Sequence, residues 1–228
     1  MAETNRVVIL GGHGKIALLA APKLARQGLE VESVIRNPDH AEEITALGAT
    51  PVVLDIEQAD VDSLARQFAG AKAVVFSAGA GGGNPERTLA VDYQAAVRTM
   101  QAAQQAGVKR FVMVSYSRAA VDVDTLDPED SFFGYAKAKH DADEYLRGTD
   151  LDYTILGPGA LTLDSSTGQI VLADAEGKIQ GRAVLDGKSN TSRENVAEVI
   201  THVLAKDAAT RRTVNFYDGS TPIAEAIG

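Results

Sequence analysis

Two side chains in the stretch GYAKAKHD have the types and the spacing that acid–base chemistry needs. Tyr135 and Lys139 stand four residues apart in a pattern typical of a helix, which places both on one face about one turn apart. A free phenol has a pKa of about 10, so it is a weak acid–base group at neutral pH. A nearby ammonium favours the phenolate, and we therefore expect Lys139 to bring the pKa of Tyr135 closer to neutrality. The same spacing also occurs by chance in purely structural helices.

Hydroxyl groups suited to holding a substrate carbonyl lie upstream, in the stretch VMVSYS. Ser115 and Ser117 follow a continuous apolar run that is typical of a buried parallel strand. Both serines therefore come at the end of a predicted strand, ahead of the helix that carries Tyr135. The order of strand, serine and Tyr–Lys pair favours a reaction centre over a chance pattern.

Anion binding is indicated where the first apolar run ends. Gly11, Gly14 and Ala17 have G-x-x-G-x-x-A spacing directly after the run RVVIL, with Gly12 between the first two. Backbone without side chains turns tightly there and approaches a pyrophosphate closely, while the next helix offers free N–H groups at its N-terminus. A glycine-rich turn is weak evidence alone, but its place in the first strand–helix unit favours a dinucleotide site.

Charged side chains around this turn distinguish between the two pyridine dinucleotides. The second predicted strand ends with Arg36 and has no acid immediately before it, whereas an NAD site expects an acid that accepts from the ribose 2′-hydroxyl. A guanidinium suits a 2′-phosphate, so NADP is favoured over NAD unless Arg36 is only a solvated loop residue. His13 and Lys15 either contact the phosphates or face water. Asp55 either meets the adenine amino group or caps the following helix.

These residues are positioned by strands that alternate with helices. Strands are predicted at 6–10, 31–35, 51–55, 72–78, 110–116, 152–157 and 213–217, and helices at 15–28, 38–48, 60–69, up to about 106, 131–148 and 193–205. This alternation predicts an α/β fold with a Rossmann-type, doubly wound parallel sheet of about seven strands. We expect 1–228 to form a single domain, in which the aperiodic segment 158–190 makes a small C-terminal substrate cap.

Composition excludes several classes of function. The chain has 228 residues, 45% of them hydrophobic, and a net charge of -9, which argues against binding to nucleic acid or to an anionic membrane. It has no cysteine, so disulfides and thiol chemistry are excluded, and no histidine pair has metal-ligand spacing, so no metal is predicted. The polar start MAETNR and the lack of a long apolar run predict a cytoplasmic protein.

The motifs together resemble the short-chain dehydrogenase/reductase superfamily, and more closely its atypical NAD(P)H-binding branch of flavin/biliverdin reductase-like and NmrA-like proteins. The stretches GGHGKIA, VIRNP, VVLD, VVFSAG, GVKRFVMVS, YAKAKHDADEYL, LDYTILGPGALT and SRENVAEVI carry the resemblance along nearly the whole chain. It implies that Tyr135 donates a proton and that Lys139 binds the nicotinamide ribose and tunes the phenol. Ser117 would polarise the substrate carbonyl, with Ser115 as the second choice.

The resemblance also implies which other residues follow the cofactor, and Asp92 is among the departures from the family pattern. The implied cofactor residues are Ile16 in the first helix, Ile56 after Asp55, the strand end Ser77, Ala78 and Gly79, the turn Pro158–Gly159, and Leu161 near the nicotinamide. Asp92 stands where many extended members have an asparagine in a proton relay, which puts a full relay in doubt.

We therefore expect an NAD(P)H-dependent oxidoreductase that reduces a small carbonyl, quinone or flavin-like substrate. Some atypical relatives bind the cofactor without established catalysis, so the alternative is a non-catalytic NADP(H)-sensing protein with a regulatory protein partner. The loop GAGGGNPER at 79–87 is either a lid over the cofactor or the start of the next helix. Phe132 and Phe133 either line the substrate pocket or, as we favour, pack in the core.

Overall fold

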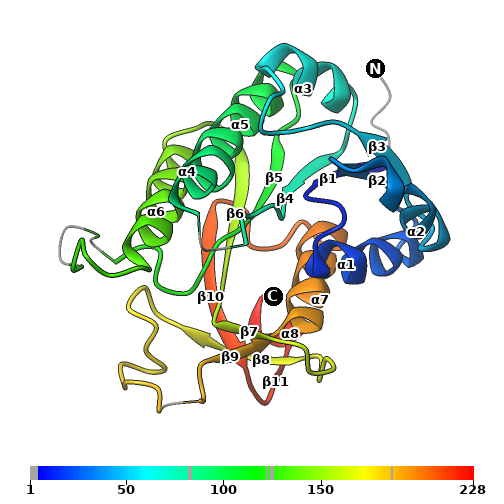
Figure 1. The fold of residues 1–228 in the computed structure, drawn as a ribbon. Helices are drawn as coiled ribbons and strands as arrows, with labels where there is room; N and C mark the ends of the chain where they lie inside the picture. The colour runs from blue at the N-terminus through cyan, green and yellow to red at the C-terminus, as the bar shows by residue number, and fades with distance from the viewer. Residues whose placement is uncertain (1–4, 82–83, 122, 124–125, 186) are drawn as a thin grey trace.

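A nine-stranded sheet separates two layers of helices in the computed structural model, which describes residues 5–81, 84–121, 123, 126–185 and 187–228 (Figure 1). Its parallel strands are β1 (Arg6–Leu10), β2 (Glu30–Ile35), β3 (Thr50–Val53), β4 (Ala73–Phe76), β5 (Arg110–Val114), β6 (Asp152–Pro158) and β10 (Arg212–Asp218). Their spatial order is β3-β2-β1-β4-β5-β6-β10. This is the Rossmann arrangement, so the predicted doubly wound sheet is confirmed.

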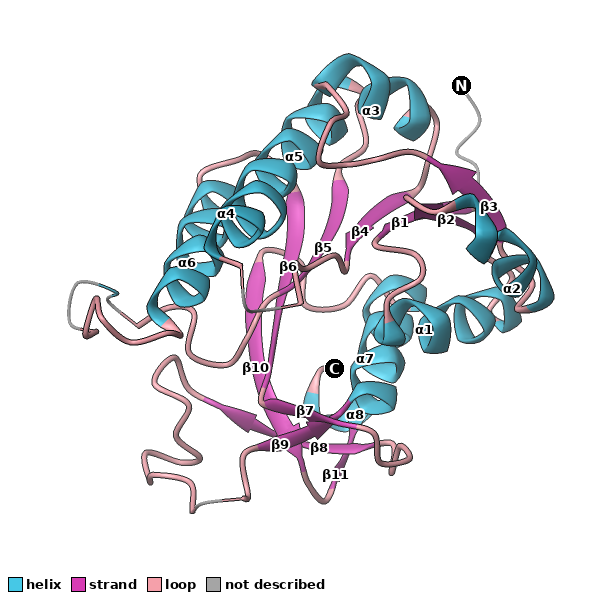
Figure 2. Ribbon diagram, in the orientation of Figure 1, coloured by secondary structure: helices cyan, strands magenta, loops and turns pink. Residues whose placement is uncertain are grey.

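Helices cover both faces of the sheet, which explains why its central strands are apolar throughout (Figure 2). One face carries α1 (Lys15–Arg26), α2 (Ala41–Ala46) with the short 3₁₀ turn η1 (Pro38–His40) before it, α7 (Arg193–Ala205) and α8 (Ile223–Ala226). The other carries α3 (Val61–Phe68), α4 (Pro85–Thr88), the π-helix η2 (Leu89–Ala95), α5 (Ala96–Gln105) and α6 (Phe133–Arg147). Every residue of β4 is buried between these layers.

The direction of the chain across the sheet creates a cleft at the carboxyl end of β1. After β3 the chain crosses to the other side of β1 and returns as β4, so β1 pairs with β2 on one edge and with β4 on the other. Ligands of open α/β sheets bind at such a reversal point. The glycine loop 11–14 after β1 and the segment 77–79 after β4 both lie there.

The helix predicted to reach about residue 106 is present but is not regular. The segments α4, η2 and α5 follow one another without a break, and η2 is a seven-residue π-helical stretch that contains Asp92. Such π-helical stretches are rare and occur frequently at functional sites. This stretch turns Asp92 inward, where its side chain is buried.

The segment 158–190 has more regular structure than its sequence indicates. β7 (Ala160–Thr162) pairs in parallel with β9 (Asn190–Ser192), and β8 (Gln169–Ala173) joins the main sheet antiparallel to both β10 and β11 (Thr221–Pro222). β7 and β8 are short and partly exposed, unlike the buried central strands. Its role as a substrate cap stays a prediction. Within the described part of the chain, no helix combines the length and apolar character needed to cross a bilayer.

Candidate functional site

The glycine loop is held tightly between two neighbouring strand ends. Gly11 has a φ of 77°, and a Cβ added to it would lie 2.7 Å from the Ala78 Cα, while one added to Gly12 would lie 2.6 Å from the Ser33 Cβ. Gly14 is the N-cap residue of α1, with no side-chain cap and no acidic residue in the first turn. The positive end of α1 is therefore not neutralised by its own side chains, which suits an anionic group.

A cavity of about 310 Å³ lies beside this loop. Ten of the predicted cofactor residues line it: Gly11, Gly12, His13, Gly14, Arg36, Asp55, Ile56, Ser77, Ala78 and Gly79. Lys15 is exposed and lines neither cavity. The His13 ring stacks on the His40 ring at a centroid distance of 3.5 Å, so His13 packs along the cavity wall.

Two arginines meet one carboxylate in this cavity. Arg36 Nη1 and Arg87 Nη2 each donate to Glu57 Oε1 at 3.0 Å. Arg87 comes from the segment 79–87 and lies far from Arg36 in sequence, so sequence reasoning missed both it and Glu57. Asp55 Oδ1 accepts from the Glu57 N–H at 2.9 Å and does not cap α3, whose N-cap is Asp60.

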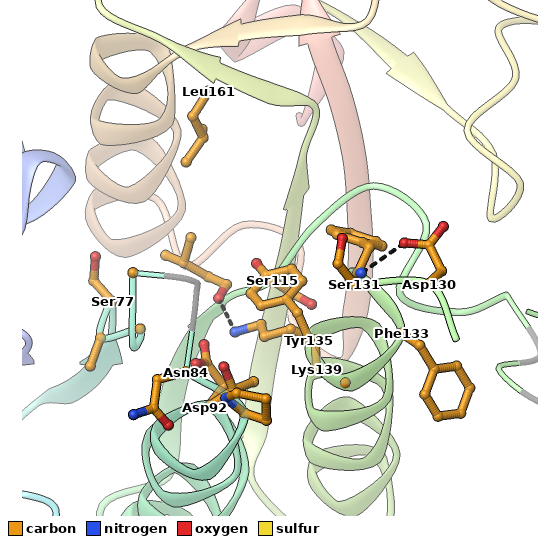
Figure 3. Close-up of a pocket in the computed structure, with 18 of the residues that line it drawn as sticks. Ser77, Asn84, Asp92, Ser115, Asp130, Ser131, Phe133, Tyr135, Lys139 and Leu161 are labelled. Atoms are coloured by element: carbon orange, nitrogen blue, oxygen red, sulfur yellow. Dashed lines mark hydrogen bonds between the residues drawn. The ribbon is translucent and has the colours of Figure 1, made fainter. Parts of the chain in front are cut away.

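A second cavity of about 840 Å³ contains the predicted reaction centre (Figure 3). Tyr135 and Lys139 project into it from α6, with Asp92 facing them from η2 and Leu161 on the opposite side. Ile16 lines this cavity too, whereas Pro158 and Gly159 line neither. Ser77, Ala78 and Gly79 line both cavities, so the two meet at the end of β4.

The two candidate serines have different environments. Ser115 lines the larger cavity, and its Oγ donates to Asp143 Oδ2 at 2.6 Å. Ser117 does not line that cavity, and its Oγ accepts from the Tyr217 hydroxyl at 3.4 Å. Ser115, and not Ser117, therefore lines the cavity that contains Tyr135, which favours Ser115 as the candidate, while its role stays a prediction. The two serines are only two positions apart in an irregular segment, and the serine pattern alone contained no signal that separates them.

The expectation that the pKa of Tyr135 is lowered toward neutrality is wrong, because this pKa is raised. Burial raises the pKa of Tyr135 above its ordinary value, and the charge of Asp92 raises this pKa further, followed by Tyr116 and Asp143. Lys139 is 2% exposed, and its Nζ donates to the Val114 carbonyl at 2.7 Å. Burial and the nearby carboxylates therefore keep Tyr135 a phenol at neutral pH.

Aromatic rings make one wall of the larger cavity. The centroid of Phe132 lies 5.3 Å from that of Tyr135 and 5.5 Å from that of Tyr116. Phe132 is half-exposed, and both it and Phe133 line the cavity. The preference for core packing is therefore wrong for both phenylalanines.

Asp92 is expected to weaken the fold as the pH rises. Burial raises its pKa, against opposing effects of Lys139, the Ala80 N–H and Arg87. The folded protein therefore holds this proton more tightly than the unfolded chain. Stability from Asp92 is fully present below the unfolded pKa of about 3.9 and is lost as the pH rises through the folded pKa.

The variant Asp92→Asn removes this titration and keeps an oxygen that can accept from Ala80, as Asp92 Oδ2 does at 3.0 Å. Urea titrations near pH 5 and near pH 8 would give the free energy of unfolding of both proteins. The advantage of Asp92→Asn over the wild type should be larger near pH 8. An equal difference at both pH values would contradict the raised pKa.

Comparisons with known proteins agree with this geometry. A model of a family described as NAD(P)H-binding matches residues 11–207. The chain is 33% identical over 239 residues to a UPF0659 protein of Schizosaccharomyces pombe, covering 96% of this chain and 92% of that protein. A solved structure from Bacillus halodurans, provisionally described as an NAD-dependent epimerase/dehydratase, is 32% identical with a TM-score of 0.83 and 96% coverage of both chains.

A second solved structure, the oxidoreductase ylbE from Lactococcus lactis, is 28% identical with a TM-score of 0.81. The match covers 97% of this chain and 94% of that one. Both structures are similar to this chain over nearly its whole length, so the likeness includes the segment 158–190 and the sheet with its cleft.

Proposed function

Because the chain belongs to the NAD(P)H-binding family, in the atypical short-chain dehydrogenase/reductase branch, we propose that it is an NADPH-dependent reductase of a small carbonyl, quinone or flavin-like compound. The observation that carries the proposal is the meeting of the two cavities at β4. The glycine loop lines one cavity, and Tyr135 and Lys139 line the other. A dinucleotide bound at the loop would extend past Ser77 toward Tyr135.

The residues in the larger cavity suit reduction better than oxidation. The bound cofactor supplies the hydride. Tyr135, protonated at neutral pH, donates its proton to the oxygen that becomes an alkoxide, which is more basic than a phenolate. Ser115 holds that oxygen from the β5 side. The ammonium of Lys139 lines the same cavity as Tyr135 and partly offsets the negative charge of Asp92 and Asp143.

The charges of the larger cavity favour an uncharged substrate. Among the described residues that line it, Lys139 is the one cationic side chain, and its Nζ already donates to Val114. Asp92 and Asp130 bring carboxyl groups to the same cavity. A nucleotide-diphosphate sugar would find no arginine there to pair with its phosphates. This supports a reductase over a sugar-nucleotide epimerase, although one similar structure is provisionally described as an epimerase/dehydratase.

A panel of compounds tests this proposal. The purified protein is incubated with NADPH and, in separate reactions, methylglyoxal, menadione, riboflavin or a UDP-sugar, and NADPH oxidation is followed by absorbance. We expect oxidation with at least one of the first three. The UDP-sugar reaction is also analysed for an epimerised product, which would form without net NADPH oxidation, and we expect none. If none of the first three is reduced although NADPH binds, a sensing protein is the better explanation.

Arg36 is expected to set the preference for NADPH over NADH. Its guanidinium and that of Arg87 lie on either side of Glu57, at the place where the sequence predicts a 2′-phosphate. Arg36→Ala should weaken NADPH binding by roughly 10- to 150-fold, the equivalent of about 1.5–3 kcal/mol for a hydrogen bond to a charged group. NADH binding should change little, because NADH lacks that phosphate.

Titration calorimetry with both cofactors measures this difference. Arg26→Ala, at the exposed end of α1, is the matched control, since it removes the same charge away from the cavity. Equal losses for NADPH and NADH in Arg36→Ala would remove the 2′-phosphate assignment.

A further inference from the structure

A fully buried carboxyl group lies directly behind the larger cavity. Asp143, on α6 one turn beyond Lys139, is 0% exposed, and its Oδ2 accepts the 2.6 Å hydrogen bond from Ser115 Oγ. Its other oxygen, Oδ1, has no hydrogen-bond partner among the described residues. Ser115 is 5% exposed and lines the cavity. The serine hydroxyl is therefore the link between a buried acid and the space where a substrate would lie.

The single proton of a serine hydroxyl can serve only one acceptor at a time. An ionised carboxylate can only accept hydrogen bonds, so an ionised Asp143 keeps the Ser115 hydroxyl hydrogen pointed at its Oδ2. Ser115 Oγ can then only accept hydrogen bonds from the cavity. A protonated Asp143 can donate its own proton to Ser115 Oγ, which releases the serine proton to point into the cavity.

Resting on the function proposed above, we propose that Asp143 is a positioning residue whose protonation decides whether Ser115 donates or accepts a hydrogen bond in the substrate cavity. With Asp143 protonated, Ser115 stabilises the oxygen that gains negative charge during reduction. With Asp143 ionised, Ser115 no longer offers that donor. Asp143 acts through Ser115 and does not itself touch the substrate.

The surroundings of Asp143 place this change near neutral pH. Burial raises the pKa of Asp143 to about 6, while Lys139, the Ser115 hydrogen bond, Arg147 and His140 act in the opposite direction. Lys139, Arg147 and His140 all lie on α6, the helix that carries Asp143. Lys139 lowers the pKa of Asp143 most, and it is buried at the wall of the cavity.

The two tyrosines near Asp143 do not titrate in the same pH range as it does. Tyr116, which follows β5, has a pKa that burial raises to about 12, and burial raises the pKa of Tyr135 as well. Both phenols are therefore uncharged when Asp143 titrates. Asp92, on η2, has a raised pKa too, and it faces Lys139 and Tyr135. A control for Asp92 is accordingly part of the test.

Direct titration of the carboxyl group tests the coupling without any substrate. The full chain is labelled with ¹³C at the aspartate carboxyl carbons, and NMR spectra are recorded from about pH 4.5 to 8.5. Asp143→Asn assigns the resonance, because the amide has nearly the same shape. Ser115→Ala should move the Asp143 midpoint upward, since the hydrogen bond that favours the carboxylate is lost.

The neighbouring Asp141 provides a matched control on the same helix, where it forms an exposed ion pair with Lys137 at 2.9 Å. Asp141→Asn should leave the Asp143 midpoint unchanged, and Asp92→Asn should shift it less than Ser115→Ala does. An Asp143 midpoint that is the same in Ser115→Ala and in the wild type would overturn the proposal.

The pH dependence of turnover distinguishes positioning from a merely structural role. With menadione and NADPH, kcat of the wild type should fall by about tenfold per pH unit above the Asp143 midpoint, as expected when one proton is required. Asp143→Asn carries no titrating proton, so this fall should disappear. A fall of the same size in Asp143→Asn would refute the role of Asp143. If menadione is not reduced at all, the proposed function is weakened, whereas the NMR titration still decides the coupling.

Discussion

Replacing Tyr135 with phenylalanine should lower kcat for carbonyl reduction by about 10²–10⁴-fold, the usual contribution of a positioned acid. The change removes one oxygen atom and keeps the ring that packs against Phe132 at 5.3 Å and Tyr116 at 5.6 Å. NADPH affinity and folding should therefore stay near the wild type. Stopped-flow or steady-state NADPH oxidation with methylglyoxal would give kcat for both proteins.

Tyr116→Phe is the matched control for this prediction. The Tyr116 ring packs against Tyr135 but does not line the larger cavity, so the kcat of Tyr116→Phe should remain close to that of the wild type. An unchanged kcat in Tyr135→Phe would show that Tyr135 is not the acid. Riboflavin as substrate offers a second comparison, because flavin reduction by hydride transfer does not need a tyrosine proton. A large loss with methylglyoxal and a small one with riboflavin would fit the proposed role.

Replacing Gly11 with alanine should destabilise the protein by about 2–5 kcal/mol and abolish measurable NADPH binding. A left-handed backbone costs an alanine about 1–2 kcal/mol, and overpacking against Ala78 adds about 1–3 kcal/mol. The Ala78 backbone cannot move aside without shifting the end of β4, where the two cavities meet. The damage therefore reaches the cofactor site as well as the fold.

Gly28→Ala separates these two causes. Gly28 has a φ of 78°, almost the same as Gly11, but an added Cβ would meet nothing within 4 Å. Gly28→Ala should therefore lose only the free energy of unfolding that a left-handed backbone costs an alanine, and NADPH binding should be retained. Urea titration and calorimetry on both variants measure the difference. If Gly11→Ala and Gly28→Ala lose the same free energy, close packing between the loop and β4 is not what requires Gly11.

Many strands and helices of this fold are specified by residues that lie close together in the chain, so they can be predicted from the sequence. The run RVVIL predicts a strand at 6–10, and β1 has those bounds. The helix predicted at 193–205 has the bounds of α7, because Ser192 caps it through hydrogen bonds from Glu194 and Asn195. No strand is predicted at β8, although its residues QIVLA are mostly apolar. β8 lies outside the alternation of strands and helices, and its antiparallel pairing with β10, some 40 residues later in the chain, is a long-range contact that local patterns do not reveal.

Patterns within the sequence are enough to predict an NAD(P)H-binding α/β protein with a glycine loop after its first strand and a Tyr–Lys pair on one helix face. Each of these depends on residues close together in the chain, whose spacing fixes their geometry. Three features depend on long-range packing: Ser115 rather than Ser117 lines the larger cavity, Arg87 joins Arg36 at Glu57, and burial with nearby carboxylates raises the pKa of Tyr135. Those outcomes depend on burial and on charges brought together from distant segments, and neither is encoded in local spacing.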